Sequence, residues 1–177
     1  MSSDFRRRKL QVRAEAALYR DWLLAGSLTQ RLRQRCQDFK VTLVAQGLAP
    51  IAPDEAAWIK LPARRRGLTR EVFLCCDAAP VVFARSVFPA AGLRGPWRFL
   101  QTLGQRPLGE ELFQRPGIAR RLVGIIGLCP GQPLYRKAWG AAPGPSRLWA
   151  RRSLFVSAGT PLLLTEVFLP AVLELTP

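Results

Sequence analysis

Two pairs of apolar, alternating segments constrain the fold of this chain more than any other feature of its sequence. The first pair is residues 68–76 (LTREVFLCC) and 81–89 (VVFARSVFP), joined by the short connection 77–80. The second pair is residues 148–156 and 161–169. Segments of this length and composition, separated by a turn-forming stretch, are typical of β-hairpins. We therefore predict two antiparallel hairpins as the basis of the fold.

The rest of the chain adds helices and further strands. Helical spacing of apolar residues predicts helices over 11–24 and 28–39, with Ser27 as the N-cap of the second. We also predict strands at 40–46 and 122–128, short helices at 97–103 and 108–113, an irregular excursion over 48–62, and a long Gly/Pro-rich loop over 129–147. Strands dominate, and the 177 residues fit one domain. The predicted fold class is α+β with an antiparallel sheet.

Composition excludes several kinds of catalytic site. The chain contains no histidine, which removes the Ser-His-Asp triad, the Cys-His dyad and the common zinc sites. Hydrophobic residues make up 49% and charged residues 22% of the chain, which is typical of a globular protein. Acid–base chemistry would therefore depend on other side chains or on the substrate, and we expect no metal site.

The four cysteines show no metal-binding or redox spacing. They are Cys36, Cys75, Cys76 and Cys129, and no CxxC pair occurs among them. Neighbours on a strand point to opposite faces, so Cys75 and Cys76 are poorly placed to bond each other. We expect four buried, reduced thiols in a cytoplasmic protein.

Neither end of the chain predicts a membrane protein. Residues 1–10 have no apolar run behind their basic residues, so we do not expect a secretory signal. The longest apolar stretch, residues 161–175, contains Glu166, Pro170 and Glu174 and is shorter than the ~20 residues that a span needs. We expect no stable membrane insertion.

The net charge of +15 raises the possibility of nucleic-acid binding. The basic residues are spread along the chain, however, and no RNP-like aromatic motif or zinc finger accompanies them. Local runs occur only at 6–8, 64–66, 120–121 and 151–152. A basic pocket for small anions fits the charge equally well, and we do not expect a nucleic-acid partner.

Two charged residues interrupt apolar strand faces. Every second residue of a strand shares a face, which places Glu166 and Arg70 each among apolar neighbours. Burying a lone charge costs several kcal/mol, so each requires a partner or a function. The two could pair with each other or lie on an edge of the sheet. Alternatively, both could face a cavity whose ligand is partly apolar and partly anionic.

Arg85 is a third candidate in this region. If the hairpin of residues 68–89 has a two-residue turn, the residue numbers of any two partners across the strands add up to an odd value. Arg85 then lies on the same face as Arg70. Two guanidinium groups on one face would repel each other unless an anion lay between them, although Arg85 could also be a solvated residue at the rim.

Six short motifs, in order along the chain, resemble the chorismate lyase family. They are GSLT at 26–29, REV at 70–72, FARSV at 83–87, RPLG at 106–109, RRS at 151–153 and LTE at 164–166. Each motif alone is weakly specific, but they occur in the order found in the family, and the resemblance runs from about residue 21 to residue 171. The connection between Phe113 and Arg151 looks longer than is usual there.

This resemblance implies a six-stranded antiparallel sheet flanked by helices, working without a cofactor. The family eliminates pyruvate from chorismate to give 4-hydroxybenzoate, the first committed step of ubiquinone biosynthesis. By matching position, Arg70 would bind the ring carboxylate together with the backbone N–H groups of Leu28 and Leu108, and Glu166 would bond the 4-hydroxyl. Arg85 matches an arginine near the mouth of the site. We expect a monomer whose partner is its small-molecule substrate.

The chemistry suits a chain without histidine. Chorismate carries two carboxylates, which planar guanidinium groups bind well, and its elimination needs no strong protein base. Two alternatives remain: an effector-binding domain of a bacterial regulator on the same fold, and a basic nucleic-acid-associated protein. No helix-turn-helix precedes residue 40, where such a regulator would carry its DNA-binding domain.

Overall fold

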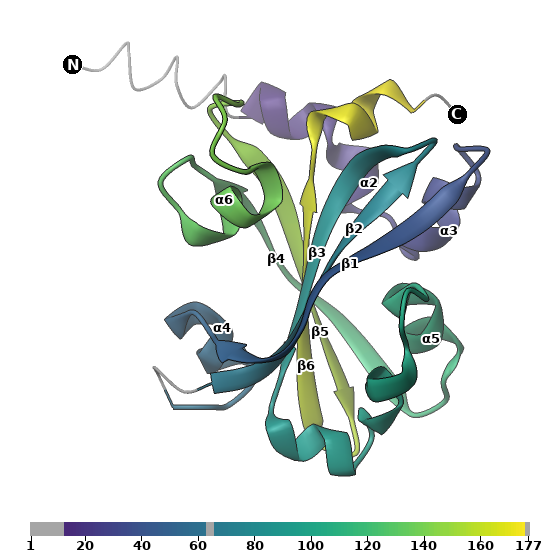
Figure 1. The fold of residues 1–177 in the computed structure, drawn as a ribbon, viewed down its shortest axis with the longest axis vertical. Helices are drawn as coiled ribbons and strands as arrows, with labels where there is room; N and C mark the ends of the chain where they lie inside the picture. Colours follow the sequence, from purple (N-terminus) through teal and green to yellow (C-terminus); the bar gives the residue numbers. More distant parts are fainter. Residues whose placement is uncertain (1–12, 63–65, 176–177) are drawn as a thin grey trace.

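A single twisted sheet forms the centre of the molecule. The computed structural model describes residues 13–62 and 66–175. Its six strands pair antiparallel in the order β1-β2-β3-β6-β5-β4 (Figure 1). The strands are β1 (Phe39–Pro50), β2 (Arg66–Cys76), β3 (Ala79–Phe88), β4 (Ile118–Leu128), β5 (Leu148–Ser157) and β6 (Thr160–Phe168). The predicted fold, α+β with six antiparallel strands, is confirmed.

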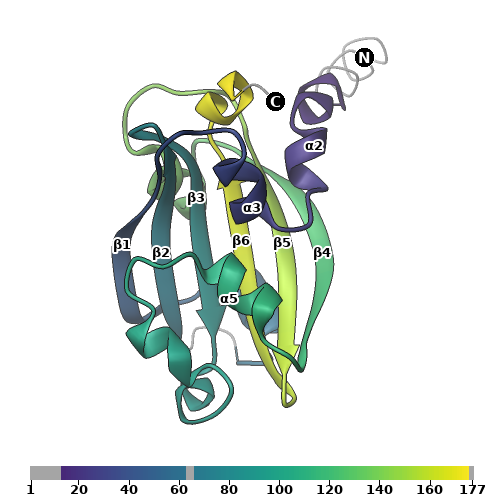
Figure 2. The same ribbon diagram turned by 90° about the vertical axis from the view of Figure 1, so that its right-hand side faces the viewer.

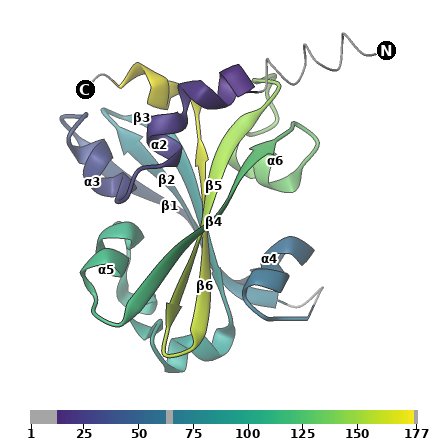
Figure 3. The same cartoon turned by 180° about the vertical axis from the view of Figure 1, so that it is seen from behind.

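Helices cover both faces of the sheet. The helices α2, α3 and α5 lie on one side, here called the front face, and α4 and α6 lie on the other, the rear face (Figures 1, 2 and 3). The helices are α2 (Arg20–Leu23), α3 (Leu28–Arg33), α4 (Pro53–Trp58), α5 (Leu108–Gln114) and α6 (Pro133–Trp139), with 3-10 turns η1 (Ala90–Arg94), η2 (Arg98–Thr102) and η3 (Pro170–Glu174). The sheet therefore has a buried core on each side.

Both predicted hairpins are present and end in two-residue turns. Asp77 and Ala78 join β2 to β3 with φ values of 50° and 70°, and Ala158 and Gly159 join β5 to β6 with φ values of 44° and 73°. Positive φ at both central residues matches the right-handed twist of the flanking strands. The prediction of two hairpins is confirmed.

A β-bulge in the first hairpin changes which residues share a face. Next to the turn Cys75 lies opposite Pro80, but further along Leu74 lies opposite Val82, so that Val81 is an extra residue. A shift of one residue turns every later side chain to the other face. Arg70 consequently pairs with Ser86, and Arg85 points to the rear. The prediction that Arg85 shares a face with Arg70 is wrong.

Several predicted segments differ from the structure in their bounds or in their content. The helix that starts at Leu28 ends at Arg33, and the strand pairing of β1 with β2 begins at Phe39. The excursion 48–62 contains the end of β1 and the helix α4. The predicted loop 129–147 contains α6, whose first helical residue is Pro133. Proline fits that position because the N–H it lacks would have no partner within the helix.

The prediction of four buried, reduced cysteines is wrong. Cys36 and Cys76 form a disulfide with a Cα–Cα distance of 5.3 Å, while Cys75 is half-buried and Cys129 is exposed. Phe39, three residues after Cys36, pairs with Cys76 across β1 and β2. Spacing along the chain reveals only pairs of nearby cysteines, whereas this disulfide joins two cysteines that are 40 residues apart.

Some predictions fall partly outside the described residues. Residues 13–18 and α2 are helical, which confirms the described part of the first predicted helix. Residues 11 and 12, the segment 1–10 with its basic run, and two residues of the run 64–66 lie outside the described part. Within it, no helix has the length and apolar character to cross a membrane.

Candidate active site

A cavity lies between the front face of the sheet and the helices α3 and α5. Figure 2 shows these two helices one above the other in front of the central strands. Most of the cavity wall is apolar, with contributions from Val72, Leu164 and Phe155. Its charged lining residues, among those described, are Arg70, Arg120, Arg151 and Glu166. The predicted shared cavity for Arg70 and Glu166 is therefore present.

Arg70, on β2, is a buried cation without an anionic partner in the described residues. Only 3% of it is exposed. Its Nη2 donates to the backbone oxygens of Gly104 at 2.9 Å and Arg106 at 3.0 Å, and its buried Nε has no hydrogen-bond partner within the described chain. Burial lowers the pKa of Arg70 to about 10. Carbonyl dipoles only partly replace the lost water, so this guanidinium favours an anion in the cavity.

Glu166, on β6, is held by Arg151 on the neighbouring strand β5. Arg151 Nε donates to Glu166 Oε2 at 2.6 Å and Nη2 donates to Oε1 at 3.2 Å. Both residues are buried, with 1% of Arg151 and 6% of Glu166 exposed. Arg151 also donates to the backbone oxygens of Trp22 and Ala25. The alternative in which Glu166 pairs with Arg70 is therefore wrong, and each carboxylate oxygen keeps a lone pair for a ligand.

The two predicted backbone donors lie at the starts of helices that face the cavity. Leu28 is the first residue of α3, after the N-cap Ser27, whose hydroxyl accepts from Gln30 N. Leu108 is the first residue of α5. The first N–H groups of a helix have no intrahelical acceptor and carry partial positive charge. Both residues line the cavity, which is where the prediction required them.

Arg151 and Arg120 are the charged lining residues that the sequence did not single out as candidates. Arg120, on β4, donates from Nε and Nη2 to Ser153 Oγ at 3.3 and 3.1 Å. Its guanidinium carbon lies 5.2 Å from the centre of the Phe113 ring. In the sequence both arginines belong to basic pairs, and such pairs are more often solvated. The signal that could have found Arg151 is its alternation with Phe155 along β5.

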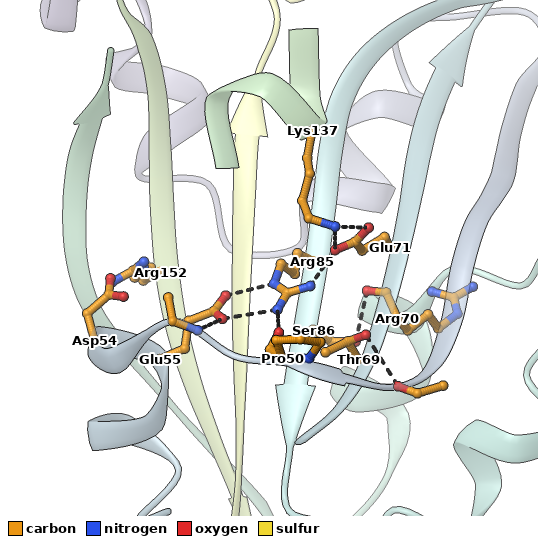
Figure 4. Close-up of polar contacts among 12 residues, drawn as sticks. Pro50, Asp54, Glu55, Thr69, Arg70, Glu71, Arg85, Ser86, Lys137 and Arg152 are labelled. Atoms are coloured by element: carbon orange, nitrogen blue, oxygen red, sulfur yellow. Dashed lines mark hydrogen bonds and ion pairs between the residues drawn. The ribbon is translucent and has the colours of Figure 1, made fainter. Parts of the chain in front are cut away.

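Arg85 lies outside this cavity, in a rear cluster of ion pairs (Figure 4). Its Nε and Nη2 donate to Glu55 at 2.8 and 3.1 Å, and its Nη1 donates to Glu71. Lys137, on α6, also donates to Glu71 at 2.8 Å. Burial lowers the pKa of Arg85, but its hydrogen bonds with Glu55 and Glu71 and their negative charge raise it overall. The structure gives Arg85 a partner set of its own and does not bring it to the predicted site.

The arrangement suits a small anion with an apolar body. Three arginines and one glutamate line the cavity among the described residues, so the wall carries excess positive charge. Apolar walls exclude water and strengthen the charged contacts. Within residues 13–62 and 66–175, no group of three or more acidic or sulfur side chains is placed to hold a metal ion.

Comparison with known proteins identifies the family. The model of the chorismate lyase family matches residues 2–175. The chain belongs to the chorismate lyase family. A relative from Aromatoleum aromaticum, described as a probable chorismate pyruvate-lyase, is 47% identical over 163 residues, which cover 90% of this chain and 88% of the relative. A Methylococcus capsulatus relative with the same description is 47% identical and covers 84% of this chain and 92% of its own length.

Solved structures share the fold of this chorismate lyase family member at low sequence identity. The effector domain of PhnF from Mycobacterium smegmatis has a TM-score of 0.57 at 18% identity, covering 82% of this chain and 90% of that domain. The C-terminal domain of the histidine utilization repressor from Pseudomonas syringae has a TM-score of 0.52 at 12% identity, covering 76% and 93%. These similarities confirm the predicted fold.

Proposed function

We propose that this protein eliminates pyruvate from chorismate to give 4-hydroxybenzoate, with the cavity between the sheet, α3 and α5 as its active site. The observation that carries this proposal is Arg70, a buried guanidinium with only carbonyl partners in the described chain, which shares an apolar cavity with Glu166. The predicted reaction class, a lyase acting on chorismate, is confirmed by the family and by the description of its relatives.

The substrate would lie with its ring against the apolar wall. Arg70 would bind the ring carboxylate with its remaining N–H groups, on Nε and Nη1, and the backbone N–H groups of Leu28 and Leu108 would add two further donors. Glu166 would accept a hydrogen bond from the 4-hydroxyl at the opposite end of the ring. These contacts fix both ends of the ring and thereby hold the reacting atoms in the orientation that the elimination requires.

The elimination itself requires little from the protein beyond positioning. The C3–O bond breaks, the hydrogen at C4 passes to the methylene carbon of the enolpyruvyl group, and the electrons of the C4–H bond complete the aromatic ring. The released group becomes pyruvate, with a new methyl group and a ketone oxygen. A six-membered cyclic arrangement allows this transfer without a protein base, and aromatisation drives it.

Arg151 supports this chemistry by keeping Glu166 in place. Its two hydrogen bonds to the carboxylate and its bonds to the α2 backbone fix the orientation of Glu166. We regard Arg151 as a positioning residue, because four of its five N–H donors already have partners within the protein. Preorganised groups of this kind stabilise developing charge without reorganising during the reaction.

The remaining predictions complete the proposal. We propose a monomeric, cytoplasmic protein that binds no nucleic acid and works without a cofactor, and the family implies that its product enters ubiquinone biosynthesis. The effector domains with the same fold are less than 20% identical to this chain, so they support the fold and not a regulatory function. No specific observation favours the nucleic-acid alternative.

Direct turnover tests the proposal. Purified protein is mixed with chorismate, and 4-hydroxybenzoate is followed by absorbance while pyruvate is measured with a coupled enzyme. We expect both products in equal amounts and a much slower reaction with Arg70→Ala. Chorismate that remains unconsumed at high enzyme concentration would overturn the proposal.

A further inference from the structure

We infer that Arg120 binds the second carboxylate of the substrate, the one on the enolpyruvyl group, and thereby distinguishes substrate from product. This inference rests on the proposed function, since it assumes that chorismate occupies the cavity. Chorismate has two carboxylates, whereas 4-hydroxybenzoate retains only the one on the ring. A residue that contacts the enolpyruvyl carboxylate would therefore contribute to substrate binding and not to product binding.

The position of Arg120 relative to Arg70 is the first argument. The register of the sheet places Arg70, Ser86, Leu164 and Ser153 opposite one another across four neighbouring strands. Arg120 donates to Ser153, so its guanidinium lies at the far end of the row that begins at Arg70. A ligand that extends across the cavity from Arg70 meets Arg120 on the opposite wall.

Glu166 lies beside the middle of this row, two residues from Leu164 on β6. Carbon atoms C3 and C4 of chorismate are neighbours, so a substrate with its 4-hydroxyl on Glu166 carries the enolpyruvyl group next to that carboxylate. Arg120 is close enough to Glu166 and Arg151 for their charges to affect it: burial and the charge of Arg151 lower the pKa of Arg120, while Glu166 raises it. The enolpyruvyl carboxylate and Arg120 therefore belong to the same part of the cavity.

The free donors of Arg120 are the second argument. Arg151 uses both guanidinium edges on Glu166 and on backbone oxygens. Arg120 has hydrogen bonds only to the hydroxyl of Ser153 within the described residues, which leaves several N–H groups for a ligand. The aromatic rings of Phe113 and Phe155 lie 5.2 and 5.9 Å from its guanidinium carbon. They restrict its movement and keep water from part of it.

Arg120→Gln tests the inference, with Arg121→Gln as the matched control. Arg121 is the next residue on β4, is exposed, and lies over Trp58 of α4 on the rear side. Both substitutions remove one positive charge, so a general change in the field of the protein would affect both equally. We expect Arg120→Gln to raise KM and to lower kcat/KM for chorismate by about 10- to 100-fold, because a charge-assisted contact is lost. The affinity for 4-hydroxybenzoate should change less than about threefold, and Arg121→Gln should leave both values unchanged.

A modified substrate provides a second, independent measurement. The methyl ester of the enolpyruvyl carboxylate should be a poor substrate for the wild-type protein, and Arg120→Gln should cause no further loss with it. Arg120→Lys retains the charge and most of the side-chain length, so it allows the same comparison if the Gln variant folds poorly.

The possible failures are distinguishable. If the wild-type protein does not convert chorismate, the proposed function fails and this inference fails with it. If turnover is normal but Arg120→Gln weakens product and substrate equally, or weakens neither, only the role of Arg120 is wrong. If esterification and Arg120→Gln each lower kcat/KM, and the two effects multiply when they are combined, the role of Arg120 is also wrong.

Discussion

The two faces of the sheet contain similar residues in opposite electrostatic arrangements. On the rear face Arg85, Arg152 and Lys137 form ion pairs with Glu55, Glu71 and Asp54. On the front face three arginines share the cavity with Glu166 alone among its described charged residues. Adjacent residues of one strand contribute to opposite faces: Arg70 lies on the front and Glu71 on the rear, and the same holds for Arg151 and Arg152.

This difference separates structural charges from binding charges. A buried ion pair that is fully hydrogen-bonded recovers much of the energy lost on leaving water, and its removal is felt as lost stability. A buried cation without a carboxylate contributes no such stability and instead increases the affinity for an anionic ligand. We therefore expect the same residue type to serve folding on the rear face and substrate binding on the front face.

The largest expected effect concerns the rear face. Arg85→Ala leaves Glu55 and Glu71 buried without their main partner, and we expect it to lower the free energy of unfolding by about 3–5 kcal/mol. Urea denaturation measures this change. Arg115→Ala is the control, because it breaks an exposed ion pair with Glu111 that should be worth less than about 1 kcal/mol. A similar small loss for Arg85→Ala would contradict a structural role for the rear cluster.

The corresponding change on the front face should affect binding. We expect Arg70→Ala to weaken 4-hydroxybenzoate binding by about 2–4 kcal/mol, because it removes a charge-assisted contact inside a pocket. The free energy of unfolding of the Arg70→Ala variant should fall less than that of Arg85→Ala, because no buried carboxylate loses its partner. Calorimetry gives the affinity, with the exposed Arg66→Ala on the same strand as control. An affinity within threefold of wild type would remove Arg70 from the site.

Glu166 is paired and also faces the cavity, so it tests the boundary between the two roles. Glu166→Gln retains the shape and one acceptor oxygen but loses the charge, and we expect kcat/KM to fall by about tenfold, which is close to 1.4 kcal/mol. Glu166→Ala should lower it further and should also destabilise the fold, because Arg151 then stays buried without its carboxylate. Both variants are compared in kcat/KM and Tm. Wild-type turnover in both would make Glu166 a purely structural partner of Arg151.

The smallest expected effect is that of chelators. The chain contains no histidine, and the elimination requires no Lewis acid, so we expect EDTA to leave both kcat and KM unchanged. Activity is measured before and after prolonged dialysis against EDTA. A loss of turnover that a divalent metal restores would show that one of the two faces holds an ion.

The sequence was sufficient for the parts of the site that depend on local pattern. Alternation along single strands placed Arg70 and Glu166 on apolar faces, because the side-chain direction of a strand has a period of two. The N-cap at Ser27 is equally local, since one hydroxyl satisfies a donor three residues away. The family motifs added the roles of Leu28 and Leu108, whose N–H groups belong to two separate helices that only the fold brings to one cavity.

Contacts between distant elements were decided by the tertiary structure alone. The extra residue Val81 reversed the direction of Arg85, because a bulge depends on how two strands fit each other and leaves no clear mark in either strand. The Arg151–Glu166 pair, the Arg120–Ser153 contact and the Cys36–Cys76 disulfide went unrecognised for the same reason: each joins residues of two different elements. The sequence by itself thus determined the strands, their turns and the charges they carry. Which charges became paired was settled by strand register and helix packing, because ion pairing depends on distances of a few ångströms that local pattern does not specify.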